Sequence, residues 1–208
     1  MVAVIDYGVG NLFSLKSSLA AIGAEAVVTA DPAVICAADR IILPGVGAFG
    51  DAAAKLAESG LGALVASEAK KGKPILGICL GMQLLFEKSY EYGEHEGLSL
   101  IKGEIRPIAD VIPKDLKIPH IGWNALSFAG EKHPLFRYLK EGDCVYFVHS
   151  FYGANCAESV IATAEYGVPL TAAVARGNVM GCQFHPEKSG AVGLSILRAF
   201  CETEGTVC

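Results

Sequence analysis

Residues 74–83, with the sequence PILGICLGMQ, contain the pattern that decides the fold. The apolar run over residues 74–79 predicts a buried strand, and a helical pattern begins directly after it. Gly77 and Gly81 stand on either side of Cys79, where a tight turn between a strand and a helix leaves no room for side chains. The stretch predicts a nucleophile elbow with cysteine in place of serine, although a buried structural cysteine before a helix is an alternative.

The chain before this turn alternates between short apolar runs and helical patterns. The first helical pattern has Leu15 and Leu19 on one face and is stopped by Gly23. Alternating strands and helices imply parallel βαβ units with right-handed crossovers. We therefore expect strands at residues 2–5, 26–29, 40–43 and 74–79, and helices at residues 12–22, 51–57 and 61–71.

The second half of the chain has a different pattern. From about residue 102 the expected strands are short, and Tyr166-Gly167 and Gly177-Asn178 indicate hairpin turns between them. The sequence predicts an α/β fold with a mixed sheet, in which a parallel core carries an antiparallel extension flanked by helices. A length of 208 residues fits one domain, residues 1–208, better than two. The expected strands are residues 159–164, 170–175 and 179–184, followed by a helix at residues 190–202.

Composition and charge argue against several classes of protein. The formal net charge is -5, and the nearest approach to a basic cluster is KKGK at residues 70–73, so no nucleic-acid surface is expected. No apolar run approaches the roughly 18 residues needed to span a bilayer, so no membrane partner is expected. The seven cysteines are irregularly spaced without a CxxC pair, which favours reduced thiols in a cytoplasmic protein.

Motifs for metals and cofactors are missing from the sequence. There is no HExxH and no cluster of histidines and cysteines at metal-ligand spacing, so we expect no metal site. The stretches GVGNL and GVGAF resemble fragments of a dinucleotide fingerprint but lack its full spacing. We therefore expect an enzyme without a cofactor.

A second chemical motif is QFHPEKS at residues 183–189. In an extended segment alternate side chains point to the same face, so His185 and Glu187 should lie together, with Pro186 restricting the backbone between them. A carboxylate beside an imidazole can orient it, as the third group of a catalytic triad does. An isolated HPE is equally compatible with a surface strand end, but together with Cys79 it predicts a Cys-His-Glu triad.

A third motif, LPGVGAF at residues 43–49, follows another expected strand. Gly45 and Gly47 flank Val46 and let the backbone turn so that N–H groups face the nucleophile. With the N–H of Leu80 these groups could form an oxyanion hole. On this segment alone, a plain glycine-rich strand exit is an equally good explanation.

The other cysteines lack the features of a nucleophile. Cys182 is close to His185 in sequence, but an odd separation along a strand puts the two side chains on opposite faces. The rest lack elbow glycines or a nearby base. We expect packing or surface thiols at Cys36, Cys144, Cys156, Cys201 and Cys208.

The motifs GICLGMQ, the distant HPE and the PG loop together resemble the class I glutamine amidotransferases. The stretches PGVGAFGDA, PHIGWN and YFVHSFY strengthen the resemblance, which runs from DYGVGN at the start to the last helix. It therefore covers essentially the whole chain. The resemblance implies a flavodoxin-like doubly wound sheet and hydrolysis of L-glutamine to L-glutamate and ammonia.

The resemblance also implies a role for each motif. It assigns the triad to Cys79, His185 and Glu187. Gln83 lies one helical turn after Cys79 and shares its face, which independently supports a contact with substrate. The implied oxyanion and substrate-binding residues are Gly45, Val46, Gly47, Leu80, Gln83, His149, Ser150 and Phe151. The family often has tyrosine in place of Phe151 and a second glycine in place of Ser99, and neither departure touches the triad.

Within the class, the resemblance is to members that work with a (βα)8-barrel cyclase subunit. Ammonia is a nucleophile only while unprotonated, so its release into water would waste it. A sealed contact with an acceptor enzyme in trans is therefore expected. The positions implied to face this partner are Asn11, Trp123, Tyr146 and Lys188.

Two other functions fit parts of the pattern. A stand-alone cysteine hydrolase of small amides or γ-glutamyl compounds would use the same triad and would need no partner. A non-catalytic docking subunit would keep the partner surface but would have no use for an intact triad.

Overall fold

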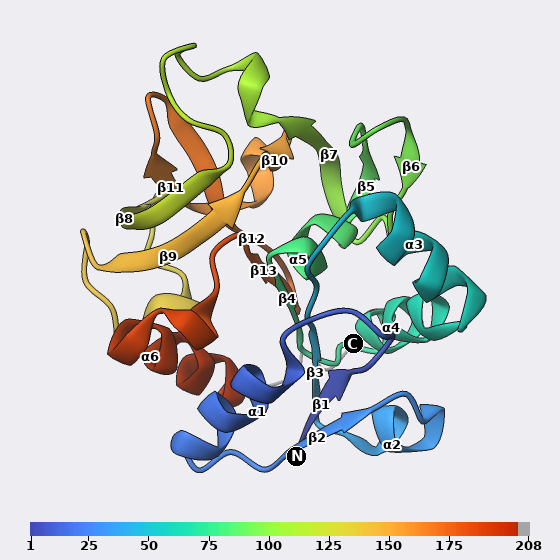
Figure 1. Ribbon diagram of the computed structural model, residues 1–208. Helices are drawn as coiled ribbons and strands as arrows, with labels where there is room; N and C mark the ends of the chain where they lie inside the picture. The colour runs from blue at the N-terminus through green and yellow to red at the C-terminus, as the bar shows by residue number, and fades with distance from the viewer. Residues whose placement is uncertain (204–208) are drawn as a thin grey trace.

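The centre of the molecule is a parallel sheet with strand order β2-β1-β3-β4-β13 (Figure 1). The computed structural model describes residues 1–203. This is the flavodoxin-like order, in which ligands bind outside the carboxyl ends of the strands. The predicted fold class is therefore confirmed. The strands are β1 (Val2–Ile5), β2 (Ala26–Thr29), β3 (Arg40–Leu43), β4 (Ile75–Ile78) and β13 (Val179–Cys182).

Further strands extend the same sheet in the antiparallel order β12-β11-β8-β9. The direction changes at β13, which is parallel to β4 on one side and antiparallel to β12 on the other. Both predicted turns are present, and Gly167 and Gly177 have φ values of 76° and 58°. These strands are β8 (His120–Phe128), β9 (Cys144–His149), β11 (Val160–Glu165) and β12 (Pro169–Arg176).

A second, smaller sheet has the order β10-β7-β5-β6 and was not predicted. Its strands β5 and β6 are too short to show a clear alternation of apolar and polar residues. The chain passes from β9 into this sheet at Ser150, which separates β9 from β10. The strands are β5 (Phe86–Ser89), β6 (His95–Glu96), β7 (Ile101–Pro107) and β10 (Phe151–Ala154).

Helices cover both faces of the main sheet (Figure 1). Leu15 and Leu19 of α1 and Phe200 of α6 are buried in one apolar cluster, and Ile35 and Val65 are buried in a second cluster with α2, α3 and α4. Burying one such side chain stabilises the fold by about 1.5–3 kcal/mol. The helices are α1 (Leu12–Ala21), α2 (Pro32–Ala37), α3 (Phe49–Glu58), α4 (Leu61–Lys70), α5 (Leu80–Leu84) and α6 (Gly190–Cys201).

Two side chains set the starts of the first helices. Asn11 Oδ1 accepts a hydrogen bond from the Ser14 N–H at 3.4 Å, and Asp31 Oδ1 accepts one from the Ala33 N–H at 2.8 Å. Such caps satisfy N–H groups that have no partner within the helix. Helix α2, which begins at Pro32, was not predicted, because its six residues are too few for a helical period to show.

The extended geometry expected through residues 183–187 is wrong. Strand β13 ends at Cys182, and Pro186–Lys188 forms a turn of 3-10 helix closed by the Lys188 N–H to His185 carbonyl bond at 3.0 Å. Proline suits the first position of such a turn because its φ is already helical. Alternation along a strand therefore explains neither the pairing of His185 with Glu187 nor the separation of Cys182 from His185. The other 3-10 turns are Ile108–Asp110, Pro134–Phe136 and Ala157–Ser159.

Two features are absent from residues 1–203. None of the helices there is both long enough and apolar enough to cross a membrane. Nor does this part of the chain hold three or more His, Cys, Asp or Glu side chains grouped as metal ligands. The predicted thiol at Cys208 lies outside the described residues.

We expect Gly81→Ala to destabilise the fold by about 3 kcal/mol or more, because its Cβ would lie 1.8 Å from the Leu43 carbonyl oxygen. Gly23→Ala is the control: a Cβ there meets nothing within 4 Å, and although Gly23, unlike Gly81, has a positive φ of 75°, only about 1 kcal/mol is expected. Urea unfolding of both variants measures the difference. Equal losses would contradict the close-packing argument.

Candidate active site

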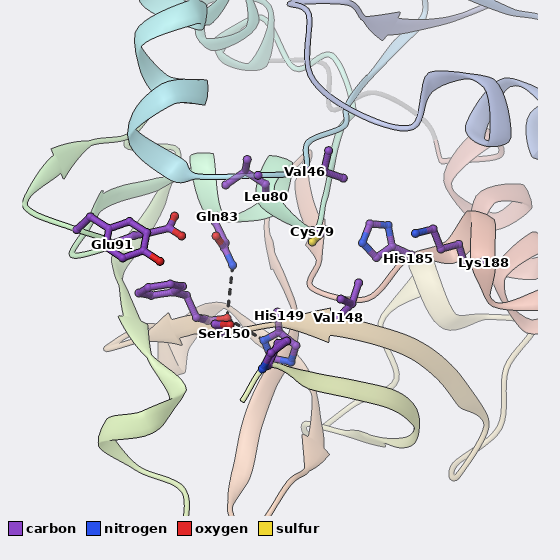
Figure 2. A pocket seen from close by; sticks show the side chains of 14 residues that line it. Val46, Cys79, Leu80, Gln83, Glu91, Val148, His149, Ser150, His185 and Lys188 are labelled. Atoms are coloured by element: carbon purple, nitrogen blue, oxygen red, sulfur yellow. Dashed lines mark hydrogen bonds between the residues drawn. The ribbon is translucent and has the colours of Figure 1, made fainter. Parts of the chain in front are cut away.

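The segments after β1, β3, β4 and β13 meet at one edge of the main sheet. Parallel neighbours place their carboxyl ends on the same side, so loops far apart in sequence become adjacent. These four segments carry the DYGVGN, PGVGAF, GICLGMQ and HPE motifs. The segments after β3, β4 and β13 border the cavity that Figure 2 shows.

Cys79 occupies a strained turn between β4 and α5. Its φ and ψ are 55° and -113°, a conformation that costs a non-glycine residue roughly 1–3 kcal/mol. The turn is held by the Cys79 N–H to Cys182 carbonyl bond at 2.7 Å and the Gln83 N–H to Cys79 carbonyl bond at 3.1 Å. The sulfur therefore lies at the start of α5, where unpaired N–H groups attract negative charge.

His185 and Glu187 form a buried pair beside Cys79. The distance from His185 Nδ1 to Glu187 Oε1 is 2.7 Å, and both side chains are less than 5% exposed. The backbone N–H of His185 donates to the Tyr146 carbonyl at 2.9 Å, which fixes the main chain that carries the imidazole ring. Because the carboxylate accepts, Nδ1 carries the proton and Nε2 is left for Cys79.

The charge state of His185 reflects these neighbours. Burial lowers the pKa of His185, but hydrogen bonding to Cys79 and Glu187 and the negative charge of both outweigh it and raise the pKa to about 9. The second oxygen of Glu187 is buried and has no hydrogen-bond partner in the described part of the chain. The carboxylate therefore acts mainly on the imidazole and favours its protonated form.

A cavity of about 400 Å³ opens over Cys79 and His185 (Figure 2). Its volume suits a small molecule. Seven of the eight residues expected to bind substrate or oxyanion line it, and Gly45 does not. The lining residues are Val46, Gly47, Cys79, Leu80, Gln83, Glu91, Tyr92, Pro119, Val148, His149, Ser150, Phe151, His185 and Lys188.

The wall opposite Cys79 is formed by residues 149–151. The Phe151 carbonyl accepts hydrogen bonds from His149 Nδ1 at 2.8 Å and from Gln83 Nε2 at 3.4 Å. Gln83 Nε2 also donates to Gln183 Oε1 at 3.1 Å. Gln83 therefore ties α5 to this wall in addition to bordering the cavity.

The two glycines of the PGVG loop are required for different reasons. Gly47 has a φ of 95°, a value that glycine adopts readily. A Cβ on Gly45 would lie 2.8 Å from Tyr7 Oη and 2.9 Å from the Gly81 nitrogen, so close packing is what requires glycine there. The expectation that both glycines serve to turn the backbone holds for Gly47 alone.

Two residues near the cavity were missed by sequence reasoning because neither belongs to a recognisable motif. Buried Tyr7 donates a hydrogen bond to the Pro44 carbonyl at 2.8 Å and so fixes the start of the PGVG loop. Glu91 accepts a hydrogen bond from the Phe49 N–H at 2.6 Å, and burial raises the pKa of its carboxyl group. Among the lining residues that the structure describes, Glu91 carries the one carboxylate.

Three of the four residues expected to face a partner form one surface cluster. The Trp123 and Tyr146 rings lie 6.0 Å apart, and Lys188 Nζ lies 5.9 Å from the centre of the Tyr146 ring. Trp123 is 56% exposed. Asn11 is separate from them, at the start of α1 beside Phe13, which is 83% exposed.

The remaining described cysteines differ from Cys79 in their surroundings. Burial raises the pKa of Cys182, Cys156 and Cys201 above the usual range of a thiol. Cys36 and Cys144 are exposed free thiols. None of these five borders the cavity.

This doubly wound sheet, with a cysteine elbow facing a histidine–glutamate pair, defines a class of α/β enzymes with a cysteine nucleophile. The family model for glutamine amidotransferase class-I matches residues 3–203, so the chain belongs to that family. Within it, the chain belongs with the glutamine amidotransferase subunits of imidazole glycerol phosphate synthase, as its similarity to curated proteins shows.

Relatives named imidazole glycerol phosphate synthase subunit HisH match nearly the whole chain. The Wolinella succinogenes protein is 50% identical over 97% of this chain and 99% of its own length. The Aquifex aeolicus protein is 51% identical, with coverage of 95% and 94%. A solved structure described as a glutamine amidotransferase has a TM-score of 0.75 at 19% identity, covering 97% and 98% of the two chains, which supports the fold.

We expect a chloroketone analogue of glutamine to label Cys79 before any other cysteine. Cys79 is only 8% exposed, so its selection over the exposed Cys36 and Cys144 must come from binding in the cavity. Iodoacetamide, which lacks the amino-acid portion, is the control and should label Cys36 and Cys144 first. Peptide mapping by mass spectrometry reads both patterns, and the same order with both reagents would contradict a substrate site at Cys79.

Proposed function

We propose that this chain hydrolyses L-glutamine to L-glutamate and ammonia through Cys79, His185 and Glu187. The observation that carries the proposal is the buried His185–Glu187 pair, 2.7 Å apart, next to a cysteine on a strained elbow at a 400 Å³ cavity. Membership of the class-I glutamine amidotransferases supplies the substrate class.

In the first step the Cys79 thiolate attacks the carbon of the side-chain amide. Leu80, Val46 and Gly47 line the same cavity, and we assign their N–H groups to stabilising the oxyanion. Removing one such donor elsewhere costs about 10²–10³ in rate. His185 then gives its proton to the departing ammonia, leaving a thioester on Cys79.

In the second step His185 acts as a base. It takes a proton from water, which attacks the thioester and releases glutamate. General acid–base catalysis of this kind contributes roughly 10²–10⁴-fold. Glu187 keeps the imidazole in one tautomer and stabilises its charged form, so the same ring serves both steps.

One lining residue suits the α-ammonium group of glutamine. Glu91 is the carboxylate available to bind the α-ammonium group, and it lies away from Cys79 in Figure 2. Ser150 and Phe151 hold the main part of the substrate from the opposite wall, with Gln83 and His149 fixing that wall.

We further infer that the ammonia passes to a (βα)8-barrel cyclase subunit, which makes imidazole glycerol phosphate and an aminoimidazole carboxamide ribotide. The names of the relatives, imidazole glycerol phosphate synthase subunit HisH, imply a partner subunit and support a role in histidine biosynthesis. The cluster of Trp123, Tyr146 and Lys188, with Asn11, is the surface we assign to the heterodimer contact. The assembled enzyme would act as a lyase fed by channelled ammonia.

Two broader features of the proposal follow from the same chemistry. We place the enzyme in the cytoplasm, because a reducing compartment keeps a catalytic thiol available. We also treat residues 1–208 as one domain, since the elbow and the HPE segment follow neighbouring strands of a single sheet.

We expect Cys79→Ala to abolish glutamine-dependent synthesis by the complex while synthesis from ammonium salt persists. The nucleophile serves only the first reaction, and the acceptor chemistry belongs to the other subunit. Cys36→Ala, at an exposed position away from the cavity, is the control and should leave both activities intact. If Cys79→Ala also removed ammonium-dependent synthesis, Cys79 would be structural; glutaminase activity that needs no partner would instead favour a stand-alone hydrolase.

We expect kcat/KM for glutamine to fall above about pH 9, where His185 loses the proton that it gives to ammonia. The pKa of His185 in the folded protein lies above the ordinary value of about 6.5. The protonated ring therefore contributes fully to the free energy of unfolding below pH 6.5, and this contribution is lost as the pH rises through 9. Glu187→Gln removes a negative charge that raises this pKa, so the fall should begin at lower pH. Glu158→Gln, at an exposed position, is the control. If Glu187→Gln left the pH at which kcat/KM falls unchanged, the role assigned to Glu187 would be refuted.

A further inference from the structure

His120 and His149 form a buried pair behind the cavity wall. They are cross-strand partners at the start of β8 and the end of β9, and their side chains are 1% and 5% exposed. His120 Nδ1 and His149 Nε2 lie 2.9 Å apart. The outer nitrogen of each ring is also engaged: His149 Nδ1 with the Phe151 carbonyl at 2.8 Å, and His120 Nε2 with Asn124 Oδ1 at 2.8 Å.

The partners at both ends of this chain of hydrogen bonds can only accept. The Phe151 carbonyl has no proton to give, so His149 Nδ1 must carry one. Asn124 Nδ2 donates to the Glu165 carbonyl at 2.8 Å, which fixes the amide with its oxygen toward His120. His120 Nε2 must therefore also carry a proton.

One more proton is needed between the two rings, since two facing lone pairs at 2.9 Å would repel. Three protons on four ring nitrogens give the pair a single positive charge. Two neutral imidazoles hold only two protons and cannot satisfy all three contacts at once.

Aromatic rings around His120 favour this charge. The Tyr166 ring stacks on His120 with centroids 4.0 Å apart, and the Phe147 ring stacks at 5.1 Å. A cation over an aromatic face is stabilised by the ring quadrupole, more strongly where water is excluded.

Burial acts against the charge and decides which ring carries it. Burial, with the charges of His120 and His185, lowers the pKa of His149 to about 4 against the effect of its bond to the Phe151 carbonyl. Burial also lowers the pKa of His120 and outweighs its bond to Asn124, so the shared proton depends on the three hydrogen-bond contacts and the stacked rings. His149 is therefore the neutral ring. The other titratable groups near the pair are Tyr166, which stacks on His120, and those that line the cavity with His149, namely Cys79, Glu91, Tyr92, His185 and Lys188.

We propose that His120 and His149 share one proton at neutral pH and that the charged pair positions the substrate wall at residues 149–151. His120 donates from both nitrogens, which leaves His149 its Nε2 lone pair and directs its Nδ1 proton to the Phe151 carbonyl. His120 is thus a positioning residue for the proposed glutaminase reaction, on which this role rests.

Loss of the shared proton would break the hydrogen bond from His149 to the Phe151 carbonyl in a fraction of the molecules. A neutral His120 can donate to His149 or to Asn124 but not to both. In the second case His149 must donate back to His120, and its Nδ1 lone pair then faces the Phe151 carbonyl. Losing one hydrogen bond of this kind corresponds to a roughly 2- to 10-fold rise in KM for glutamine.

Two variants of Tyr166 separate the charge from the packing. Tyr166→Leu removes the aromatic face, whereas Tyr166→Phe keeps it and loses only the hydroxyl bond to the Lys117 carbonyl. Nitrogen NMR of the chain labelled in its histidines, with signals assigned from single histidine variants, counts the ring protons across a pH series. We expect three protonated nitrogens on the pair at pH 7. The pH at which the third proton is lost should be roughly 0.5 to 1 unit lower in Tyr166→Leu and unchanged in Tyr166→Phe.

Two protonated nitrogens at pH 7, or the same titration in both variants, would overturn the shared proton. This measurement does not depend on activity, so it stands even if the proposed reaction is wrong. Glutamine kinetics of the complex over the same pH range test the positioning role. KM should rise with the loss of the third proton, at lower pH in Tyr166→Leu, and a KM that stays constant through that loss would refute the role.

Discussion

The site depends on one close contact, the approach of the start of α5 to the end of β3. A Cβ on Gly81 would lie 1.8 Å from the Leu43 carbonyl oxygen, so the helix sits almost against the neighbouring strand. This closeness keeps Cys79 in its strained conformation and places the PGVG loop beside it, with Gly45 fitting between Tyr7 and the helix. Strain at a functional residue persists only where the surroundings fix it, and here glycine on both elements makes that possible.

The same contact explains why the chemistry can be shared among distant segments. Once Cys79 is fixed, β13 lies next to β4 and delivers the HPE segment to it, and the Cys79 N–H is bonded to the end of β13 at 2.7 Å. His185 is then held from the other side by the Tyr146 carbonyl. Cys79 and His185, the proposed nucleophile and base, are therefore each held by a backbone hydrogen bond to a neighbouring strand.

Sequence reasoning recovered the parts of this arrangement that depend on local pattern. The parallel strands, the elbow at Cys79 and the hairpin turns all follow from short-range rules on apolar runs and glycine. The small sheet and α2 did not, because short elements carry too little periodicity. His185 and Glu187 were paired for the wrong reason, since a 3-10 turn brings them together where an extended strand was assumed. Sequence reasoning did not find Glu91, Tyr7 or the His120–His149 pair, because their contacts join residues that are far apart in the sequence.

The β8–β9 ribbon shows how two functions can share one element. Alternation along paired strands sends Ile121, Trp123 and Tyr146 to one face and His120 and His149 to the other. The first face is exposed and is the one that we assign to a partner, while the second is buried and contacts the cavity wall through the Phe151 carbonyl. A partner that presses on the exposed face must therefore act on a ribbon whose reverse side is tied by hydrogen bonds to the substrate wall.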